Sequence, residues 1–246
     1  MEYILKKAKR AQADIAMGLI EEGRKYLKEQ GSDQWLEARR GIITASTVGK
    51  LLTSTGKVAN NDTSRTLTET LVAERLSGQI DYTPPTRDMQ RGTILEAFSR
   101  DIYAEHYAPV DEVGFGKLET PTYIIGASPD GLVSDDGGFE TKSPRPRTHL
   151  RTILEDRVPA HYMAQVQTCL LVFNRAWWDF ASYVPGMPYY VTRVFPDPRW
   201  QEAIIAAAEQ FEENAVALTA KYERETHGRP KTEYHDPFAE EDIIIG

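Results

Sequence analysis

Apolar side chains recur at helical spacing along several stretches of the chain. Residues 3–30 are rich in Ala, Leu, Lys and Glu and contain no Pro. Their apolar residues lie three or four positions apart, which predicts an amphipathic helix. Similar patterns with flanking Gly, Ser and Pro predict further helices over residues 33–40, 47–52, 65–77, 88–108, 160–174 and 198–224. Ser46 is expected to cap the helix over 47–52 with its hydroxyl.

The helix predicted over residues 88–108 combines an apolar face with an acidic residue. The side chains predicted to line that face are Ile94, Leu95, Phe98, Ile102 and Tyr103. Glu96 falls on or near the same face, which is unusual for a carboxylate. On its own, Glu96 would be interpreted as an edge residue paired with an Arg.

Shorter apolar runs predict strands over residues 123–128, 132–133, 139–142, 177–183 and 189–195. Residues 135–138, Asp-Asp-Gly-Gly, are predicted to form a hairpin turn. The fold class is therefore α/β (α+β), with a small mixed central sheet flanked by helices. Residues 1–30 form a predicted helical extension, 31–225 the main domain, and 226–246 a polar and acidic tail.

Composition excludes several classes of protein. Hydrophobic residues make up 41% and charged residues 27% of the chain, as in globular proteins. Cys169 is the only cysteine, which excludes a disulfide framework, a Cys-x-x-Cys zinc site and a cysteine-ligated iron–sulfur cluster. The net charge of -8 argues against a protein that coats nucleic acid by bulk charge. No secretory signal and no membrane span are evident, so we expect a soluble cytoplasmic protein.

Two acidic residues and a lysine converge on the predicted hairpin. Asp130 and Glu140 fall on adjacent strands, and Glu140 and Lys142, two positions apart, point to the same side. Two carboxylates at a strand end suit Mg²⁺, which takes one or two carboxylates together with waters and phosphate oxygens. A neighbouring lysine is suited to hold or activate an attacking water. The alternative is a surface hairpin with ordinary charges.

The segment after the hairpin is locally basic. Within sixteen residues it contains Lys142, Arg145, Arg147, Arg151 and Arg157. Such a run is typical of contacts with the phosphates of a DNA strand, although a solvated loop would look similar. The aromatic residues at 177–190 are expected to be strand and core residues rather than platforms for base stacking.

Four motifs in order resemble those of the phage lambda exonuclease and YqaJ-type viral recombinase family, within the PD-(D/E)xK nuclease superfamily. They are Trp35-x3-Arg39-x-Gly41-x-Ile43-Thr44-Ala45-Ser46, Gly92-x3-Glu96, Ser128-Pro129-Asp130-Gly131 with Glu140-x-Lys142, and Tyr162-Met163-Ala164-Gln165-Val166-Gln167. The resemblance covers about residues 33–195 and implies a restriction-endonuclease-like core.

The resemblance also implies roles for individual residues. The implied Mg²⁺ ligands are Asp130, Glu140, the backbone carbonyl of Thr141 and Glu96. Lys142 would position or deprotonate the attacking water. The implied ligands of a terminal 5′-phosphate are Arg39, Ser46 and Gln165, with Arg40 and Gln167 as close competitors. Arg145, Arg147 and Arg151 would contact the DNA strand. Two Mg²⁺ ions are expected, and Mn²⁺ is expected to substitute.

The implied activity is 5′-to-3′ hydrolysis of one strand of duplex DNA from a 5′-phosphorylated end, which leaves a 3′ overhang for phage-type recombination. The expected partners are double-stranded DNA ends, two further copies in a homotrimeric ring and a single-strand annealing protein, without a membrane. A phage or prophage protein of this kind would act in the bacterial cytoplasm. The alternatives are an endonuclease of the same fold and a non-catalytic DNA-binding or assembly protein.

Overall fold

The computed structural model describes residues 24–26, 33–53, 55–80 and 86–235. Most of the helix predicted over 3–30 lies outside these ranges. Within them, Arg24–Tyr26 forms strand β1 and not helix, because it pairs antiparallel with Gly116–Glu119, strand β3. Hydrogen bonding to a sheet edge here overrides a local preference for helix.

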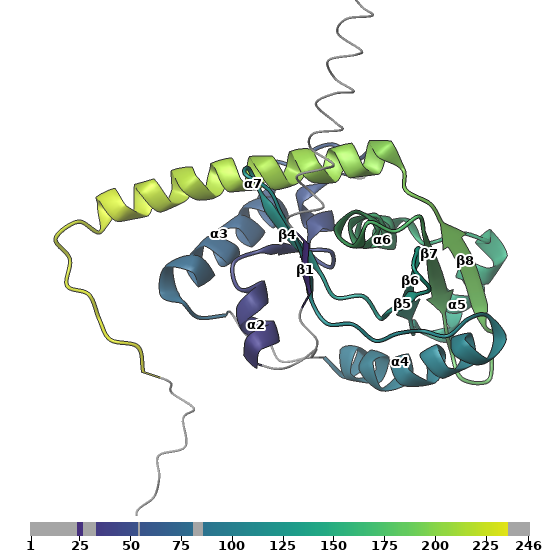
Figure 1. Cartoon of the computed structure of the whole chain (residues 1–246). Helices are drawn as coiled ribbons and strands as arrows, with labels where there is room; N and C mark the ends of the chain where they lie inside the picture. The colour runs from purple at the N-terminus through teal and green to yellow at the C-terminus, as the bar shows by residue number, and fades with distance from the viewer. Residues whose placement is uncertain (1–23, 27–32, 54, 81–85, 236–246) are drawn as a thin grey trace, which may run out of the picture.

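The strands form two four-stranded sheets rather than one central sheet (Figure 1). The first has the order β1-β3-β4-β2, in which β2 runs parallel to β4. The second has the order β5-β6-β7-β8, in which β6 runs parallel to β7. The remaining strands are β2 Ile43–Thr44, β4 Ile124–Ala127, β5 Gly131–Val133, β6 Gly137–Lys142, β7 Trp177–Ser182 and β8 Tyr190–Val194. Both sheets are therefore small and mixed, as the α/β prediction requires.

Helices flank both sheets, and one of them lies between the sheets. The helices are α2 Asp33–Arg39, the 3-10 helix η1 Val48–Leu51, α3 Asp62–Ser77, α4 Arg87–His106, α5 Pro146–Glu155, α6 Ala160–Phe173 and α7 Pro198–Glu225. Helix α6 contacts β3 and β4 of one sheet and β6 and β7 of the other (Figure 1). None of the helices in the described part of the chain is long and apolar enough to cross a bilayer.

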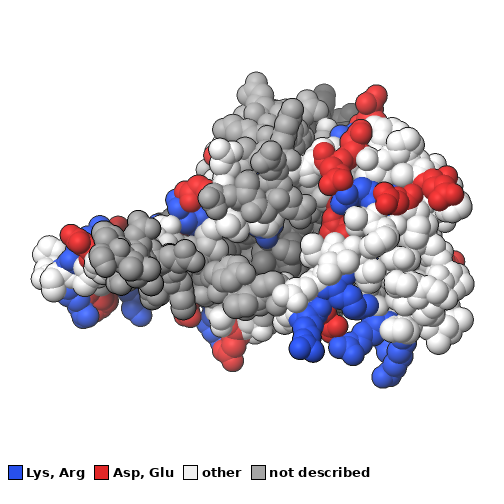
Figure 2. All heavy atoms as spheres, turned by 90° about the horizontal axis from the view of Figure 1, so that it is seen from below, with Lys and Arg blue, Asp and Glu red and all other residues white. Residues whose placement is uncertain are grey.

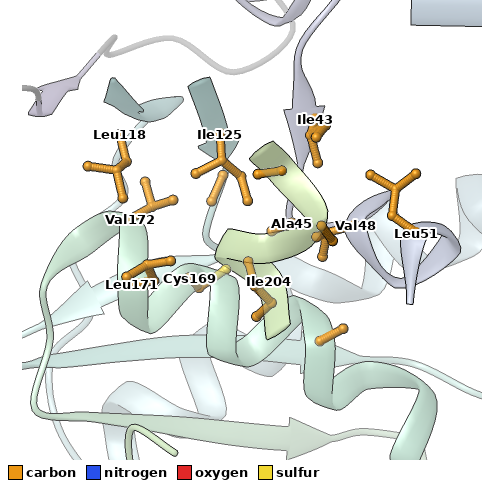
Figure 3. Packing of buried hydrophobic residues seen from close by; sticks show 14 of the residues in the cluster. Ile43, Ala45, Val48, Leu51, Leu118, Ile125, Cys169, Leu171, Val172 and Ile204 are labelled. Carbon is orange, nitrogen blue, oxygen red and sulfur yellow. The ribbon is translucent and has the colours of Figure 1, made fainter. Parts of the chain in front are cut away.

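The main core fills the space around α6. Cys169 is fully buried there, and side chains from β3, β4, η1, α6 and α7 point toward one another (Figure 3). Leu118, Ile125 and Val172 are completely shielded from solvent. This packing of apolar surface fixes α6 against both sheets, and with it the position of the residues on the first turns of α6.

Helix α4 buries only part of the face that the sequence pattern predicts. Only Ser99 and Tyr103 are buried on this helix, whereas Ile94 is 65% and Phe98 56% exposed. Tyr103 packs against Phe139 of the second sheet, and the Ser99 hydroxyl lies 2.5 Å from the hydroxyl of Thr141 on β6. The part of the predicted face formed by Ile94 and Phe98 faces solvent.

The predicted hairpin exists, but its glycines lie in a strand and not in the turn. Gly137 and Gly138 pair with Val133 and Leu132, so the turn is confined to residues 134–136. The rings of Trp177 and Trp178, on the neighbouring strand β7, lie where a β-carbon at these glycines would be, within 2.2–2.6 Å. The glycines are thus needed for close approach of the tryptophan rings.

Helix α5 was not predicted, because its sequence is rich in Pro and Arg. Pro146 occupies the first turn of the helix, where the missing N–H costs nothing. The segment therefore begins a helix shortly after the β5–β6 hairpin instead of forming a loop. As expected, the aromatic residues of β7 and β8 are mainly core residues, since Trp178, Phe180 and Tyr190 are buried.

Candidate active site

Strands β5 and β6 bring Asp130, Glu140 and Lys142 together at one end of the second sheet. Because Gly131 pairs with Phe139, Asp130 lies opposite Glu140 in the register. Asp130 accepts a hydrogen bond of 2.7 Å from the backbone N–H of Thr141. The Lys142 ammonium lies 2.5 Å from Oε1 of Glu140. The geometry thus places together the two carboxylates and the lysine that the hairpin pattern predicts.

Glu140 is almost completely buried, and only one of its two carboxylate oxygens has hydrogen-bond partners in the part of the chain that the structure describes. Its Oε1 atom accepts hydrogen bonds from Lys142 and, at 2.6 Å, from the side-chain amide of Gln165 on α6. Its Oε2 atom is shielded from solvent and has no hydrogen-bond partner among the described residues. A buried carboxylate oxygen without a partner is costly, and a bound cation would remove that cost.

Glu96 extends from α4 toward the same place but is held by a neighbouring arginine. Arg100, one turn further along α4, donates to Oε1 of Glu96 at 2.9 Å. Arg100 also donates to the backbone carbonyl of Asp130 at 3.1 Å and pairs with Glu112. Arg100 therefore ties α4 to the β5–β6 hairpin and fixes Glu96 beside it.

The pKa values of the three clustered carboxyl groups, Glu96, Asp130 and Glu140, are raised. Burial, and then the nearby Asp130 carboxylate, raise the pKa of Glu140 to about 8 and the pKa of Glu96 to about 7. Burial also raises the pKa of Asp130. For Lys142, burial lowers the pKa, but the Glu140 and Asp130 carboxylates outweigh it, so the net pKa is above its ordinary value. The cluster accordingly favours a further positive charge, and Lys142 stays protonated.

These residues suit Mg²⁺ as a donor set, although they do not form a ready-made cage. Within the described ranges, no three His, Cys, Asp or Glu side chains converge closely enough to hold a metal by themselves. The orphaned Oε2 of Glu140, the Asp130 carboxylate and the Thr141 carbonyl are hard oxygen donors. Mg²⁺ usually completes such a set with waters and substrate phosphates, so the residues fit this ion.

The cluster opens onto a cavity of about 440 Å³ that could admit a phosphodiester. Glu96, Asp130 and Lys142 line it on one side. The remaining lining comes from the first turns of α4, from Thr141, from residues 143–145 and from Tyr162. Acidic and basic groups therefore share one open cavity.

Arg39 lies close to the start of the β5–β6 hairpin, whereas Arg40 points elsewhere. Arg39 reaches the Ser128 hydroxyl at 3.4 Å and stacks over the ring of Trp35, with its guanidinium carbon 4.0 Å from the ring centre. Burial lowers its pKa, partly opposed by Glu74. Arg40 instead pairs with Glu37 on the surface and donates to the carbonyl of residue 78.

The two glutamines of α6, Gln165 and Gln167, have different hydrogen-bond partners. Gln165 donates a hydrogen bond to the Glu140 carboxylate, as described above. Gln167 is fully buried, donates to the carbonyl of Phe195 and accepts from the N–H of Asp197, each at 2.9 Å. Gln167 thus fastens the connection between β8 and α7, and Gln165 is the one that lies at the site.

Ser46 does not cap a helix, so that prediction was wrong. The 3-10 helix begins at Val48 with Thr47 as its N-cap residue, and no side chain caps it. The Ser46 hydroxyl instead lies 3.1 Å from the hydroxyl of Thr44 at the end of β2. Thr47 is held by Thr44, whose N–H donates to the Thr47 hydroxyl, and this turn displaces the expected cap.

The basic segment divides into two parts. Arg145 lines the cavity and pairs with Asp88 at 3.0 Å. Arg147 and Arg151 do not line it and lie on the exposed face of α5. Two arginines at the site were not predicted from the sequence: Arg91, which lines the cavity and donates to the carbonyl of Ser143 at 2.8 Å, and Arg100. The spacing of four residues between Glu96 and Arg100 was the available signal for the latter.

Comparisons with known proteins agree with this arrangement. The model of the YqaJ-like viral recombinase domain matches residues 34–176. The crystal structure of LHK-Exo in complex with dAMP is similar over 79% of this chain and 98% of the other, with 32% identity and a TM-score of 0.70. A second structure of that protein, an alkaline exonuclease from Laribacter hongkongensis, covers 78% and 99%, with 32% identity and a TM-score of 0.66.

A more distant structure supports the fold alone. The phage-related exonuclease from Haemophilus somnus 129PT has 15% identity and a TM-score of 0.53 over 72% of this chain and 96% of the other. No curated protein sequence matches the chain. The family model spans more than half of the chain, and the β5–β6 hairpin lies inside the matched region. The chain therefore belongs to the YqaJ-like viral recombinase domain family and has the fold of a nuclease.

Proposed function

We propose that the protein is a Mg²⁺-dependent exodeoxyribonuclease that digests one strand of linear duplex DNA in the 5′-to-3′ direction from a 5′-phosphorylated end. The observation that carries the proposal is the buried carboxylate of Glu140, one oxygen of which has no hydrogen-bond partner among the described residues, beside Asp130 and Lys142, which line an open cavity. The relative LHK-Exo has been crystallised with dAMP, a deoxynucleoside monophosphate of the kind that such digestion releases.

The proposed reaction is hydrolysis of a phosphodiester. A water attacks the phosphorus, the bond to the 3′ oxygen breaks, and that oxygen leaves as a hydroxyl after gaining a proton. The Mg²⁺ ligands would be Asp130, Glu140 and the Thr141 carbonyl, with Glu96 beside them. This set would hold one Mg²⁺ ion or two. Mg²⁺ or Mn²⁺, when bound, would supply stabilisation of the charge on the attacking and leaving oxygens.

Lys142 is better suited to orient the water than to deprotonate it. Its ammonium lies against Glu140, and the raised pKa keeps its proton in place. A protonated lysine donates a hydrogen bond and neutralises charge that develops on the phosphate. We therefore assign Lys142 to positioning the water and stabilising the transition state.

Arg39, Ser46 and Gln165 are proposed to bind the terminal 5′-phosphate. Arg39 lies beside Ser128, two residues before Asp130, and Gln165 contacts Glu140. An arginine fork and an uncharged amide are suitable donors to phosphate oxygens. Cleavage leaves a new 5′-phosphate on the shortened strand, so the same residues would receive the end for the next step. Arg145 is proposed to contact the strand at the cavity.

The proposed partners are double-stranded DNA ends, two more copies of the chain in a homotrimeric ring, and a single-strand annealing protein that takes up the 3′ overhang. In this proposal the protein acts in phage-type recombination in a bacterial cytoplasm. A ring would hold an acidic protein on DNA by topology rather than by bulk attraction.

Digestion of a linear duplex with one 5′-phosphorylated and one 5′-hydroxyl end tests the proposal. We expect Mg²⁺-dependent release of mononucleotides from the phosphorylated strand, with the complementary strand left intact. Covalently closed circular DNA is the matched control and should remain uncut. Cleavage of the circle would favour an endonuclease of the same fold, and absence of hydrolysis in Mg²⁺ or Mn²⁺ would favour a non-catalytic DNA-binding protein.

A further inference from the structure

Helix α5 is turned with its polar side inward. The buried residues are His149, which lies 2.7 Å from the Ser182 hydroxyl, and Thr152. Leu150 and Leu154, one turn apart on the opposite side, are 50% and 75% exposed. A helix that exposes its apolar side chains beside a charged surface is typical of an interaction site.

Helix α4 presents a second exposed stripe with the opposite charge. Ile94 and Phe98 are exposed one turn apart, and Asp101 and Glu105 continue the same side of the helix. On α5, the stripe of leucines is accompanied by Arg147. Neither Asp101 nor Arg147 makes an ion pair with another residue that the structure describes. Figure 2, which shows the molecule from below, likewise has basic side chains gathered at one edge and acidic ones mainly elsewhere.

The two stripes match in spacing when the helices run antiparallel. On α4, the step from Ile94 to Phe98 is four residues, and the step to Asp101 is three. On α5, read backwards, the same steps of four and three lead from Leu154 to Leu150 and to Arg147. Both stripes therefore extend over roughly 10 Å of helix axis, at about 1.5 Å per residue. Antiparallel docking pairs Ile94 with Leu154, Phe98 with Leu150, and Asp101 with Arg147.

We propose that the exposed stripe of α4 in one copy of this chain docks antiparallel against the exposed stripe of α5 in the next copy. The contact uses different surfaces on the two copies, so repetition of it closes a ring when the rotation fits. This inference rests on the proposed homotrimer and names the surfaces that would build it. With this inference, the role assigned to Arg147 changes from contact with the DNA strand to contact between subunits. Arg151 lies at the border of that contact.

A second copy fits the stripes better than DNA does. DNA phosphates would leave the apolar pair on α5 exposed and would repel the acidic stripe on α4. A second copy covers both apolar pairs and neutralises Asp101 and Arg147 in a single contact.

Two variants that each damage one surface test the proposal sharply. Ile94→Glu/Phe98→Glu and Leu150→Glu/Leu154→Glu should each be monomeric in native mass spectrometry, while the wild type forms a trimer. A mixture of the two variants should form a 1:1 dimer that grows no further, because each pair retains only one intact contact. Val216→Glu, at an exposed apolar position on α7, is the control and should assemble like the wild type.

Charge exchange gives a second, independent test. Asp101→Arg and Arg147→Asp should each weaken assembly by about tenfold or more, which corresponds to about 1.4 kcal/mol, and the double variant should restore it. Arg157→Asp, just beyond the end of α5, is the matched control. A monomeric wild type, single-surface variants that still form trimers, or a mixture that forms no dimer would each overturn the proposal.

The variant Leu150→Glu/Leu154→Glu also tests whether α5 contacts DNA instead. If this variant still assembles but no longer binds DNA, the proposed contact between copies is overturned in favour of a DNA contact. The assembly measurement is separate from hydrolysis. A chain that forms the ring through these helices without digesting DNA would contradict only the proposed nuclease activity.

Discussion

The two sheets of the molecule differ in what they bury. The sheet β1-β3-β4-β2 buries apolar side chains such as Leu118 and Ile125, whereas β5-β6-β7-β8 buries apolar side chains and, in addition, the charged Glu140 and Asp179. Asp179 is satisfied by the Tyr103 hydroxyl at 2.6 Å and by two hydrogen bonds from Arg193. Glu140 is not fully satisfied. One sheet is a scaffold, and the other carries buried charge at the expense of stability, as functional sites often do.

The largest expected effect comes from Glu140→Gln in the second sheet. The change keeps the shape of the side chain but removes a buried charge with an orphaned oxygen. We expect DNA hydrolysis in Mg²⁺ to fall on the order of a thousandfold, or about 4 kcal/mol in the barrier. At pH 9, above the pKa of about 8 for Glu140, the unfolding free energy should stay the same or rise, because a poorly compensated buried charge is lost. Rates of hydrolysis and denaturant unfolding measure the two effects.

Ile125→Ala in the first sheet should show the reverse behaviour. Ile125 is completely buried against α6, and truncation in a packed core costs about 2–5 kcal/mol of stability. At a temperature where the variant is still folded, hydrolysis should stay close to that of the wild type. A variant that lost activity while keeping its stability would contradict the division between a scaffold sheet and a catalytic sheet.

Arg39→Ala and Arg40→Ala form a matched pair with a smaller expected effect. Arg39 lies by the catalytic hairpin, and Arg40 is engaged by Glu37 on the surface. Loss of a charged hydrogen-bonding group costs about 1.5–3 kcal/mol, so Arg39→Ala should reduce the preference for 5′-phosphorylated over 5′-hydroxyl ends by roughly tenfold to a hundredfold. Arg40→Ala should leave the preference unchanged. Equal effects of the two variants would remove Arg39 from the phosphate site.

The pH dependence of stability should show the smallest effect. The pKa of Glu140 rises from 4.5 to about 8 in the folded protein. Its contribution to stability is therefore complete below about pH 4.5 and is lost as the pH rises through about 8. Without divalent cations, the melting temperature should fall by a few degrees between pH 5.5 and pH 9, since about 1 kcal/mol shifts it by roughly 2–4 °C.

Mg²⁺ should reverse that trend and raise the melting temperature more at high pH, because its ligands must be ionised. Glu140→Gln is the control, and its melting temperature should depend less on both pH and Mg²⁺. Identical pH profiles of the variant and the wild type would show that Glu140 does not titrate as described.

The sequence predicted the catalytic hairpin because a strand period of two fixes which side chains share a face. Glu140 and Lys142 had to point together, and the turn brought Asp130 to them. Contacts between distant segments could not be predicted in this way. The role of Gly137 depends on the ring of Trp177, about forty residues further along the chain, and the pairing of residues 24–26 depends on β3.

The helices show a different limit of prediction. The apolar spacing of α4 was read correctly, but spacing does not say whether a face meets the core or solvent, and Ile94 and Phe98 are exposed. Helix α5 was missed because Pro146 suggested a break, although proline is tolerated in a first turn. Both errors fall on the helices that we propose as the contact between copies.

The most direct test of the central claim is a time course of mononucleotide release from a linear duplex with a single 5′-phosphorylated end, comparing the wild type with Glu140→Gln at equal concentration. Our account predicts release from the phosphorylated strand by the wild type only in the presence of Mg²⁺ or Mn²⁺, and almost none by the variant. Release by Glu140→Gln at the wild-type rate, or by the wild type without a divalent cation, would contradict it.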